Sequence, residues 1–242
     1  MKTNVTIRVI AKGGKFLGAD IGGAYVTIQN AQTGEILAEG RTSGGSGVVN
    51  LMDISINRTE FYPNTQASAF NTTLSLTEPC LIKVTATGPN GGLQSANTVT
   101  ATQWIIPGKD LTGGNGLLLE LPGLLVQVQS PPTHQNFGSV AAAKVDFQAN
   151  VTMMCGCPIA PNTAWNPKLF EVGAMIYQLD TPKGNVYLET VKMTFSGETS
   201  QFTGSWTTPN YGFFEAVVYA YQASNGNSGM GKVTFFSAAP SA

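Results

Sequence analysis

The sequence is built from short runs in which apolar and polar residues alternate, each ended by turn-forming residues. One run spans residues 4–11, where Val5, Ile7 and Val9 fall on one side. Residues 211–221, rich in aromatic residues and valine, are the strongest strand candidate of the chain. Strict alternation is the period of a β-strand, whose successive side chains point to opposite faces. The 28 glycines and 13 prolines favour turns between such strands. The pattern predicts an all-β fold, and the first run predicts a strand with one buried face.

Two glycine-rich hairpins indicate two domains. Residues 80–100 read CLIKVTATGPNGGLQSANTVT, and residues 214–234 read FEAVVYAYQASNGNSGMGKVT. Each has the order strand, glycine-rich turn, strand, which is typical of the last hairpin of an immunoglobulin-like sandwich. We therefore predict two tandem immunoglobulin-like antiparallel β-sandwich domains, at residues 1–107 and 117–242, joined by a glycine-rich linker at residues 108–116. The alternative is that the two hairpins are alike only because any two hairpins are alike.

Two segments resemble known families. Residues 20–47, DIGGAYVTIQNAQTGEILAEGRTSGGSG, resemble the start of transthyretin-like or carboxypeptidase-regulatory-like β-sandwich modules, with a G-A-x-V-x-I strand, a T-G turn, a short strand and a glycine turn. The expected aromatic return strand is not evident after Gly47. This resemblance implies a non-catalytic adhesive, structural or binding module. Residues 125–152, LVQVQSPPTHQNFGSVAAAKVDFQANVT, resemble the opening of bacterial immunoglobulin-like domains.

The segment 150–157 concentrates sulfur. On a strand, Met153, Cys155 and Cys157 would point to the same side. Three sulfur atoms on one face suit copper as Cu(I), or part of a zinc site. His134, the single histidine of the chain, is the candidate to complete such a site. Two alternatives stay open: the sulfur residues are ordinary core residues, or Cys155 and Cys157 form a disulfide with each other or with Cys80.

Charge and composition exclude several functions. Charged residues make up 11% of the chain, the net charge is -1, and no basic patch indicates a nucleic-acid partner. The apolar segment 116–128 is broken by Glu120, Pro122 and Gly123, so it predicts no membrane insertion. Its part up to Leu125 suits an interdomain contact or a self-association surface. No Gly-x-Ser-x-Gly motif, phosphate loop or histidine-based triad indicates an enzyme.

The weakly charged, threonine- and asparagine-rich composition is typical of a secreted or cell-surface protein. No apolar leader follows Met1, so we expect an extracellular or periplasmic protein whose signal peptide has been removed.

Tyr211, Phe213, Tyr219 and Tyr221 would share one face of their strand. Exposed aromatic faces bind sugars or proteins, but core packing is the expectation here. The main hypothesis is a non-catalytic exported module that recognises a protein or glycan or assembles at the cell surface. The alternative is a soft-metal protein that binds copper.

Overall fold

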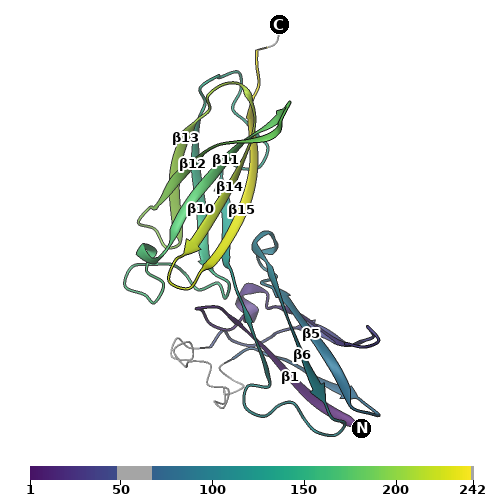
Figure 1. The fold of residues 1–242 in the computed structure, drawn as a ribbon. Helices are drawn as coiled ribbons and strands as arrows, with labels where there is room; N and C mark the ends of the chain where they lie inside the picture. The colour runs from purple at the N-terminus through teal and green to yellow at the C-terminus, as the bar shows by residue number, and fades with distance from the viewer. Residues whose placement is uncertain (48–66, 241–242) are drawn as a thin grey trace. The chain divides into compact units, whose positions relative to one another are not determined.

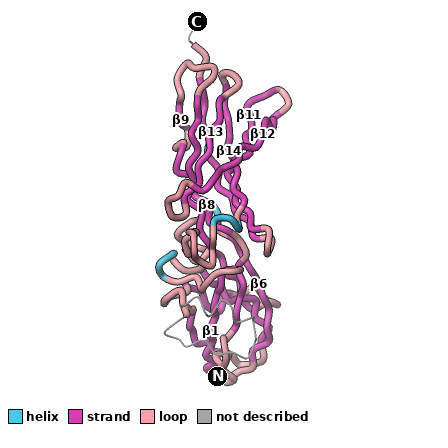
Figure 2. The backbone as a smooth tube through the Cα atoms, turned by 90° about the vertical axis from the view of Figure 1, so that its left-hand side faces the viewer, coloured by secondary structure: helices cyan, strands magenta, loops and turns pink. Residues whose placement is uncertain are grey.

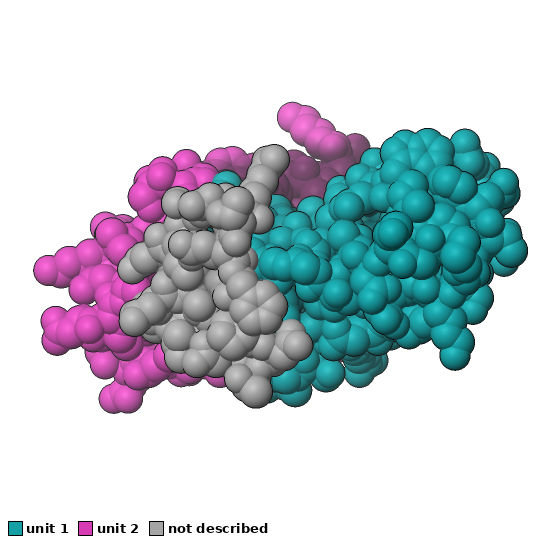
Figure 3. Space-filling model, turned by 90° about the horizontal axis from the view of Figure 1, so that it is seen from below, with its two compact units in different colours: residues 1–123, 153–157 teal, residues 124–152, 158–242 magenta. Residues whose placement is uncertain are grey.

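The computed structural model describes residues 1–47 and 67–240. These residues form strands joined by turns, and helix occurs only as short 3-10 segments (Figure 2). The chain divides into two compact units (Figure 3). Unit 1 holds residues 1–123 and 153–157, and unit 2 holds residues 124–152 and 158–242.

Unit 1 contains two sheets. The three-stranded sheet has the order β4-β1-β7, and the four-stranded sheet has the order β3-β2-β5-β6. All its pairings are antiparallel except that of β1 with β7, which is parallel. The elements are β1 (Lys2–Ala11), η1 (Ala19–Ile21), β2 (Tyr25–Asn30), β3 (Ile36–Arg41), β4 (Phe70–Ser75), β5 (Cys80–Gly88), η3 (Leu93–Ser95), β6 (Asn97–Ile105) and β7 (Leu117–Leu121).

The core of unit 1 follows the alternation of its strands. Strand β5 buries every second side chain from Cys80 to Gly88, and β2 buries Val26 and Ile28. The prediction of one buried face for the first strand was wrong, because β1 is buried on both faces from Val5 to Ala11. Phe16, Ala67 and Leu118 pack with Ile10 of β1 and cover the side that alternation had assigned to solvent.

The domain boundary differs from the predicted one. Residues 117–121, which we expected to open the second domain, form β7 and pair with β1 from Ile7 to Ala11. The predicted linker also belongs to unit 1. There the Leu111 N–H donates to the Asn4 carbonyl, and the Asn4 N–H donates to Asp110 Oδ1, both at 2.8 Å. Glycine content alone had indicated a linker. The first unit instead ends at Gly123 and also takes in residues 153–157.

Unit 2 has the strand order β8-β10-β13-β12-β11-β14-β15-β9. Figure 1 labels its strands β10 to β15. Strand β12 joins the two halves of this order, because its first part pairs with β11 and its last two residues pair with β13. The grouping of β8, β10 and β13 apart from β11, β14 and β15 is that of an immunoglobulin-like sandwich. The elements are β8 (Leu124–Ser130), β9 (Gln135–Asn136), β10 (Lys144–Met153), η4 (Pro167–Leu169), β11 (Glu171–Thr181), β12 (Gly184–Phe195), β13 (Gln201–Thr207), β14 (Gly212–Gln222) and β15 (Asn227–Ser237).

Aromatic rings fill the core of unit 2. The Trp206 ring contacts the Phe214 ring with centroids 5.3 Å apart, and the Phe214 and Phe235 rings lie 5.7 Å apart. Phe147 meets Phe235 edge to face at 6.1 Å, an arrangement that the ring quadrupole favours. The prediction of an all-β fold with two sandwich domains in tandem is thereby confirmed, although its boundaries move.

Candidate functional site

One sheet of unit 2 turns its aromatic side chains outward. In β14 the inner positions are Phe214, Ala216, Val218 and Ala220, all fully buried. The alternate residues therefore face away from the core, and strand pairing places residues of β11, β12 and β15 beside them. We call this surface the aromatic face; it consists of Met175, Tyr177, Tyr187, Phe213, Val217, Tyr219, Tyr221, Met230 and Phe236.

Several members of the aromatic face are well exposed. Phe213 is 51% exposed and Tyr187 is 52% exposed, while Met230, Tyr221 and Met175 are exposed by 41%, 39% and 36%. The core-packing expectation for this set was wrong: Phe213, Tyr219 and Tyr221 face outward. The physical reason is that the set includes Glu215 on the same side, whereas the alternate positions from Phe214 to Ala220 are all apolar. That difference in polarity was the signal in the sequence.

Contacts between neighbouring rings hold the aromatic face in place. The Phe213 and Phe236 rings lie 5.6 Å apart, and the Tyr177 and Tyr187 rings lie 5.7 Å apart. Both are cross-strand pairs, and such aromatic pairs stabilise a sheet. The rings are therefore positioned by their neighbours before any partner arrives.

Tyr219 lies over Gly173, the residue paired with it on β11. A Cβ atom at Gly173 would come within 2.8 Å of the Tyr219 ring, so only glycine leaves room for this ring position. The Tyr219 hydroxyl donates a hydrogen bond to Glu171 Oε1 at 2.7 Å. Burial, followed by this bond to the carboxylate, raises the pKa of Tyr219 to about 12. The ring and the hydroxyl are thus both fixed.

Few charges interrupt the aromatic face. Lys232 and Glu215 form an ion pair with 3.3 Å between Nζ and Oε1, and they neutralise each other across β14 and β15. The Glu171 carboxylate accepts the hydrogen bond from Tyr219, so Glu215, Lys232 and Glu171 all have partners within this surface. The result is an apolar surface with a few oriented polar groups.

The predicted sulfur site lies in a turn. We expected a strand to continue to Cys157, but β10 ends at Met153. The Met153 N–H donates to the Cys157 carbonyl at 3.1 Å, and the Gly156 N–H donates to the Met153 carbonyl at 2.8 Å. Gly156 has φ +76°, a left-handed conformation that glycine adopts without steric cost. We call residues 153–157 the cysteine turn.

Both thiols of the cysteine turn are buried and free. Cys155 is 1% exposed and Cys157 is 5% exposed. The Lys15 N–H donates to Cys155 Sγ at 3.3 Å. A hydrogen bond from the Cys157 thiol is the main cause that lowers the pKa of Cys155 to about 7, against the opposing effect of burial. The same contact raises the pKa of Cys157. Cys155 is therefore the thiol that ionises first.

The remaining candidates lie elsewhere. Cys80 is also free; it begins β5 opposite Ile105, and burial raises its pKa. His134 belongs to unit 2, where its ring lies 5.0 Å from that of Phe236. Within residues 1–47 and 67–240, no group of three or more His, Cys, Asp and Glu side chains is placed to hold a metal ion. The copper or zinc site of Met153, Cys155, Cys157 and His134 stays a prediction.

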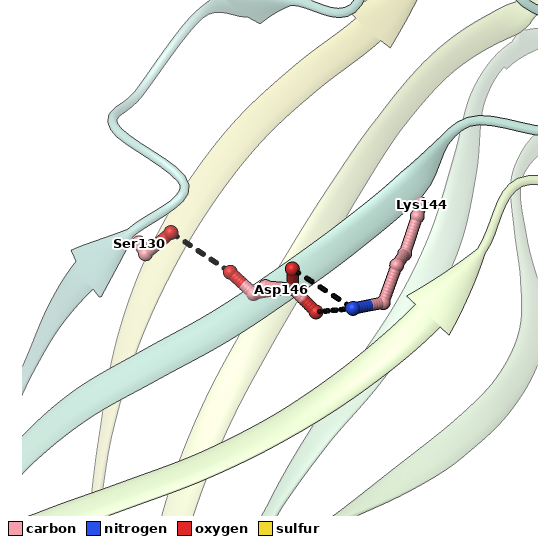
Figure 4. Close-up of polar contacts among 3 residues, drawn as sticks. All are labelled: Ser130, Lys144 and Asp146. Atoms are coloured by element: carbon pink, nitrogen blue, oxygen red, sulfur yellow. Dashed lines mark hydrogen bonds and ion pairs between the residues drawn. The ribbon is translucent and has the colours of Figure 1, made fainter.

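A polar hollow of about 500 Å³ lies on β10 and β13 of unit 2. At its edge the Ser130 hydroxyl donates to the Asp146 carbonyl at 2.8 Å, and Lys144 Nζ lies 2.9 Å from Asp146 Oδ1 (Figure 4). Both charged side chains are about two-thirds exposed, so this ion pair contributes little. The hollow offers polar groups without an exposed ring, in contrast to the aromatic face.

No known family profile and no curated protein matches the chain. Among solved structures, the fibronectin(III)-like modules of Clostridium thermocellum CbhA align with 10% identity and a TM-score of 0.30, over 99% of this chain and 95% of that one. A chimeric titin Z1Z2 tandem aligns with 12% identity and a TM-score of 0.24, over 100% and 92% of the two chains.

The part of the chain that the structure describes contains no helix with the length and apolar character needed to cross a bilayer.

Proposed function

We propose that this chain is an exported, non-catalytic binding module that recognises another protein through the aromatic face of unit 2. The observation that carries the proposal is the outward placement of Phe213, Tyr219, Tyr221 and their neighbours. Aromatic residues and methionine are enriched in protein interfaces, and tyrosine is enriched among the few residues that contribute most of the binding energy. Exposed apolar patches on soluble domains mark such interaction sites.

The exposed fractions of these side chains set how much binding energy the aromatic face can contribute. Fully burying a large apolar side chain is worth about 1.5–3 kcal/mol. The five most exposed members of the aromatic face are 36–52% exposed, so covering each of them recovers roughly 1 kcal/mol. Association costs about 4–15 kcal/mol, so burial of these five residues alone offsets only the lower end of this cost. Preorganised rings reduce the remaining cost, because a partner does not need to order them.

Protein is the preferred partner class over glycan. Met175, Val217 and Met230 lie among the rings, and these aliphatic and thioether groups favour apolar side chains of a partner over the hydroxyl groups of a sugar. The low charge of the chain supports export to an extracellular or periplasmic location. Self-association is a special case of the same proposal, in which the partner is a second copy.

We also infer that unit 1 is a transthyretin-like sandwich that serves as a structural module. The segment that resembles this family forms the hairpin of β2 and β3, with Gly34 in a left-handed turn between them at φ +79°. Support also comes from the placement of β2 beside β5 in a four-stranded sheet.

Site-specific photo-crosslinking tests the binding proposal. A photoreactive phenylalanine analogue replaces Phe213 in one sample and Ser205, an exposed residue on β13, in the control sample. Both proteins are exposed to extracellular proteins from the source organism. We expect a discrete crosslinked protein from position 213, competed away by the unmodified chain, and none from position 205. Equal crosslinking at both positions, or none at either, would contradict the proposal.

A glycan array run on the same proteins distinguishes the partner class. Binding of an oligosaccharide that is lost in Tyr221→Ala, without any crosslinked protein, would retain the aromatic face as the site and overturn protein as its partner.

A further inference from the structure

The two thiols of the cysteine turn are held together by the backbone. The bond from the Met153 N–H to the Cys157 carbonyl closes the turn, and the bond from the Gly156 N–H to the Met153 carbonyl bends it. Cα atoms two residues apart are separated by at most about 7 Å in an extended chain, and bending shortens this distance. A disulfide requires Cα atoms about 4.4–6.8 Å apart. The turn therefore brings the cysteines into the range that a disulfide requires.

The surroundings of the two sulfur atoms also suit oxidation. Both cysteines lie in one turn that two backbone hydrogen bonds hold, so no rearrangement of distant strands is needed to join them. Cys155 Sγ accepts the Lys15 N–H at 3.3 Å, and this donor stabilises negative charge on sulfur. Thiolates are the species that attack disulfides.

We propose that Cys155 and Cys157 form a reversible disulfide with each other by thiol–disulfide exchange with a small disulfide such as oxidised glutathione. This inference is independent of the aromatic face. Cys80 takes no part, because it begins β5, where it lies opposite Ile105 and not in the cysteine turn.

The exchange proceeds in two steps. First, the Cys155 thiolate attacks one sulfur of oxidised glutathione; the S–S bond of the reagent breaks and one glutathione thiolate leaves. Second, Cys157 gives up its thiol proton and attacks the Cys155 sulfur, which forms the protein S–S bond and releases the second glutathione thiolate. The leaving thiolates take up the protons that the cysteines lost. Two protein thiols are oxidised, and one oxidised glutathione is reduced to two glutathione molecules.

Burial sets the rate of this exchange. Cys155 is 1% exposed and Cys157 is 5% exposed, so the reagent reaches sulfur only when the turn opens. Local opening of this kind has a smaller free-energy cost than global unfolding. We expect oxidation of the native chain to be slower than oxidation of the urea-unfolded chain, and still to reach completion.

The test uses the full chain, equilibrated at graded ratios of oxidised to reduced glutathione, then alkylated and digested with trypsin. The peptide 145–168 holds both cysteines. We expect it to lose two hydrogen atoms in mass, to resist alkylation and to recover when reduced glutathione is restored. A peptide that stays fully alkylatable at the most oxidising ratio, or one linked to Cys80, would overturn the proposal.

Three variants assign the roles of the cysteines. In Cys157→Ser the second step is blocked, so we expect glutathione to remain attached to Cys155. In Cys155→Ser we expect no attached glutathione, and Cys80→Ser should behave like the unmodified chain. Circular dichroism of each variant confirms that it is folded. Attachment of glutathione in Cys155→Ser but not in Cys157→Ser would show that Cys157 attacks first, which would overturn the proposed order of the two steps.

Discussion

Tyr219 lies over Gly173, and its hydroxyl donates to Glu171. At the residue scale this arrangement explains how a large ring can be both outward-facing and fixed. The glycine removes the side chain that would lift the ring off the sheet, and the carboxylate holds the hydroxyl. Rings held in this way offer contact area to a partner at low entropic cost.

Gly173→Ala tests this arrangement. The new Cβ would lie 2.8 Å from the Tyr219 ring, so the ring or the strand must shift. We expect the free energy of unfolding to fall by about 1–3 kcal/mol, the usual cost of overpacking, measured by urea denaturation. Gly113→Ala is the control, because a Cβ there meets no atom within 4 Å. Equal free energies of unfolding for the two variants would contradict the close contact between Gly173 and the Tyr219 ring.

The raised pKa of Tyr219 predicts that the stability of the chain depends on pH. Its pKa is raised from 10.0 to about 12 in the folded chain, so the folded state keeps a proton that the unfolded state loses. The stabilisation is complete below pH 10 and is lost as pH rises towards 12. We expect Tyr219→Phe to show a weaker fall in unfolding free energy over this interval. Identical pH profiles would indicate that the Tyr219 pKa is not raised.

At the element scale, β7 is a strand of unit 1. Leu121 is fully buried, and β7 pairs with β1 in parallel. Parallel pairing requires a long connection, and here the two strands are separated by most of unit 1 in sequence. Residues 117–121 of this apolar segment therefore form a core strand of unit 1.

Leu121→Ala tests whether β7 belongs to the core of unit 1. A buried leucine truncated to alanine costs about 2–5 kcal/mol, and we expect this cost to fall on unit 1. Hydrogen exchange should show faster exchange of the β1 amides from Ile7 to Ala11, with the β14 amides unchanged. If protection were lost in β14 and kept in β1, the segment would belong to the second domain, as the sequence had indicated.

These elements also show what the sequence could and could not predict. The hairpins β5–β6 and β14–β15 were predictable, because alternation and a glycine-rich turn are local signals. The partner of β7 was not, since pairing between distant segments leaves no local pattern. The end of β10 depended on one left-handed glycine, Gly156. The outward direction of Phe213 was available from the polarity of Glu215, which shares its face.

At the scale of the whole molecule, the two units carry different features. Unit 1 contains the cysteine turn, and unit 2 carries the aromatic face. The central claim is that unit 2 binds a protein partner through this face. The claim requires that the rings contribute binding energy without being needed for folding, and Phe213 suits this test because it is 51% exposed.

The decisive measurement is the affinity of the crosslinked partner for Phe213→Lys and for Ser205→Lys, by titration calorimetry. Phe213→Lys places a charge in the apolar surface, and we expect affinity to fall at least about tenfold, or about 1.4 kcal/mol. Ser205→Lys adds the same charge to β13, and affinity should stay unchanged. Equal affinities of the two variants would contradict the account, because binding would then not depend on the aromatic face.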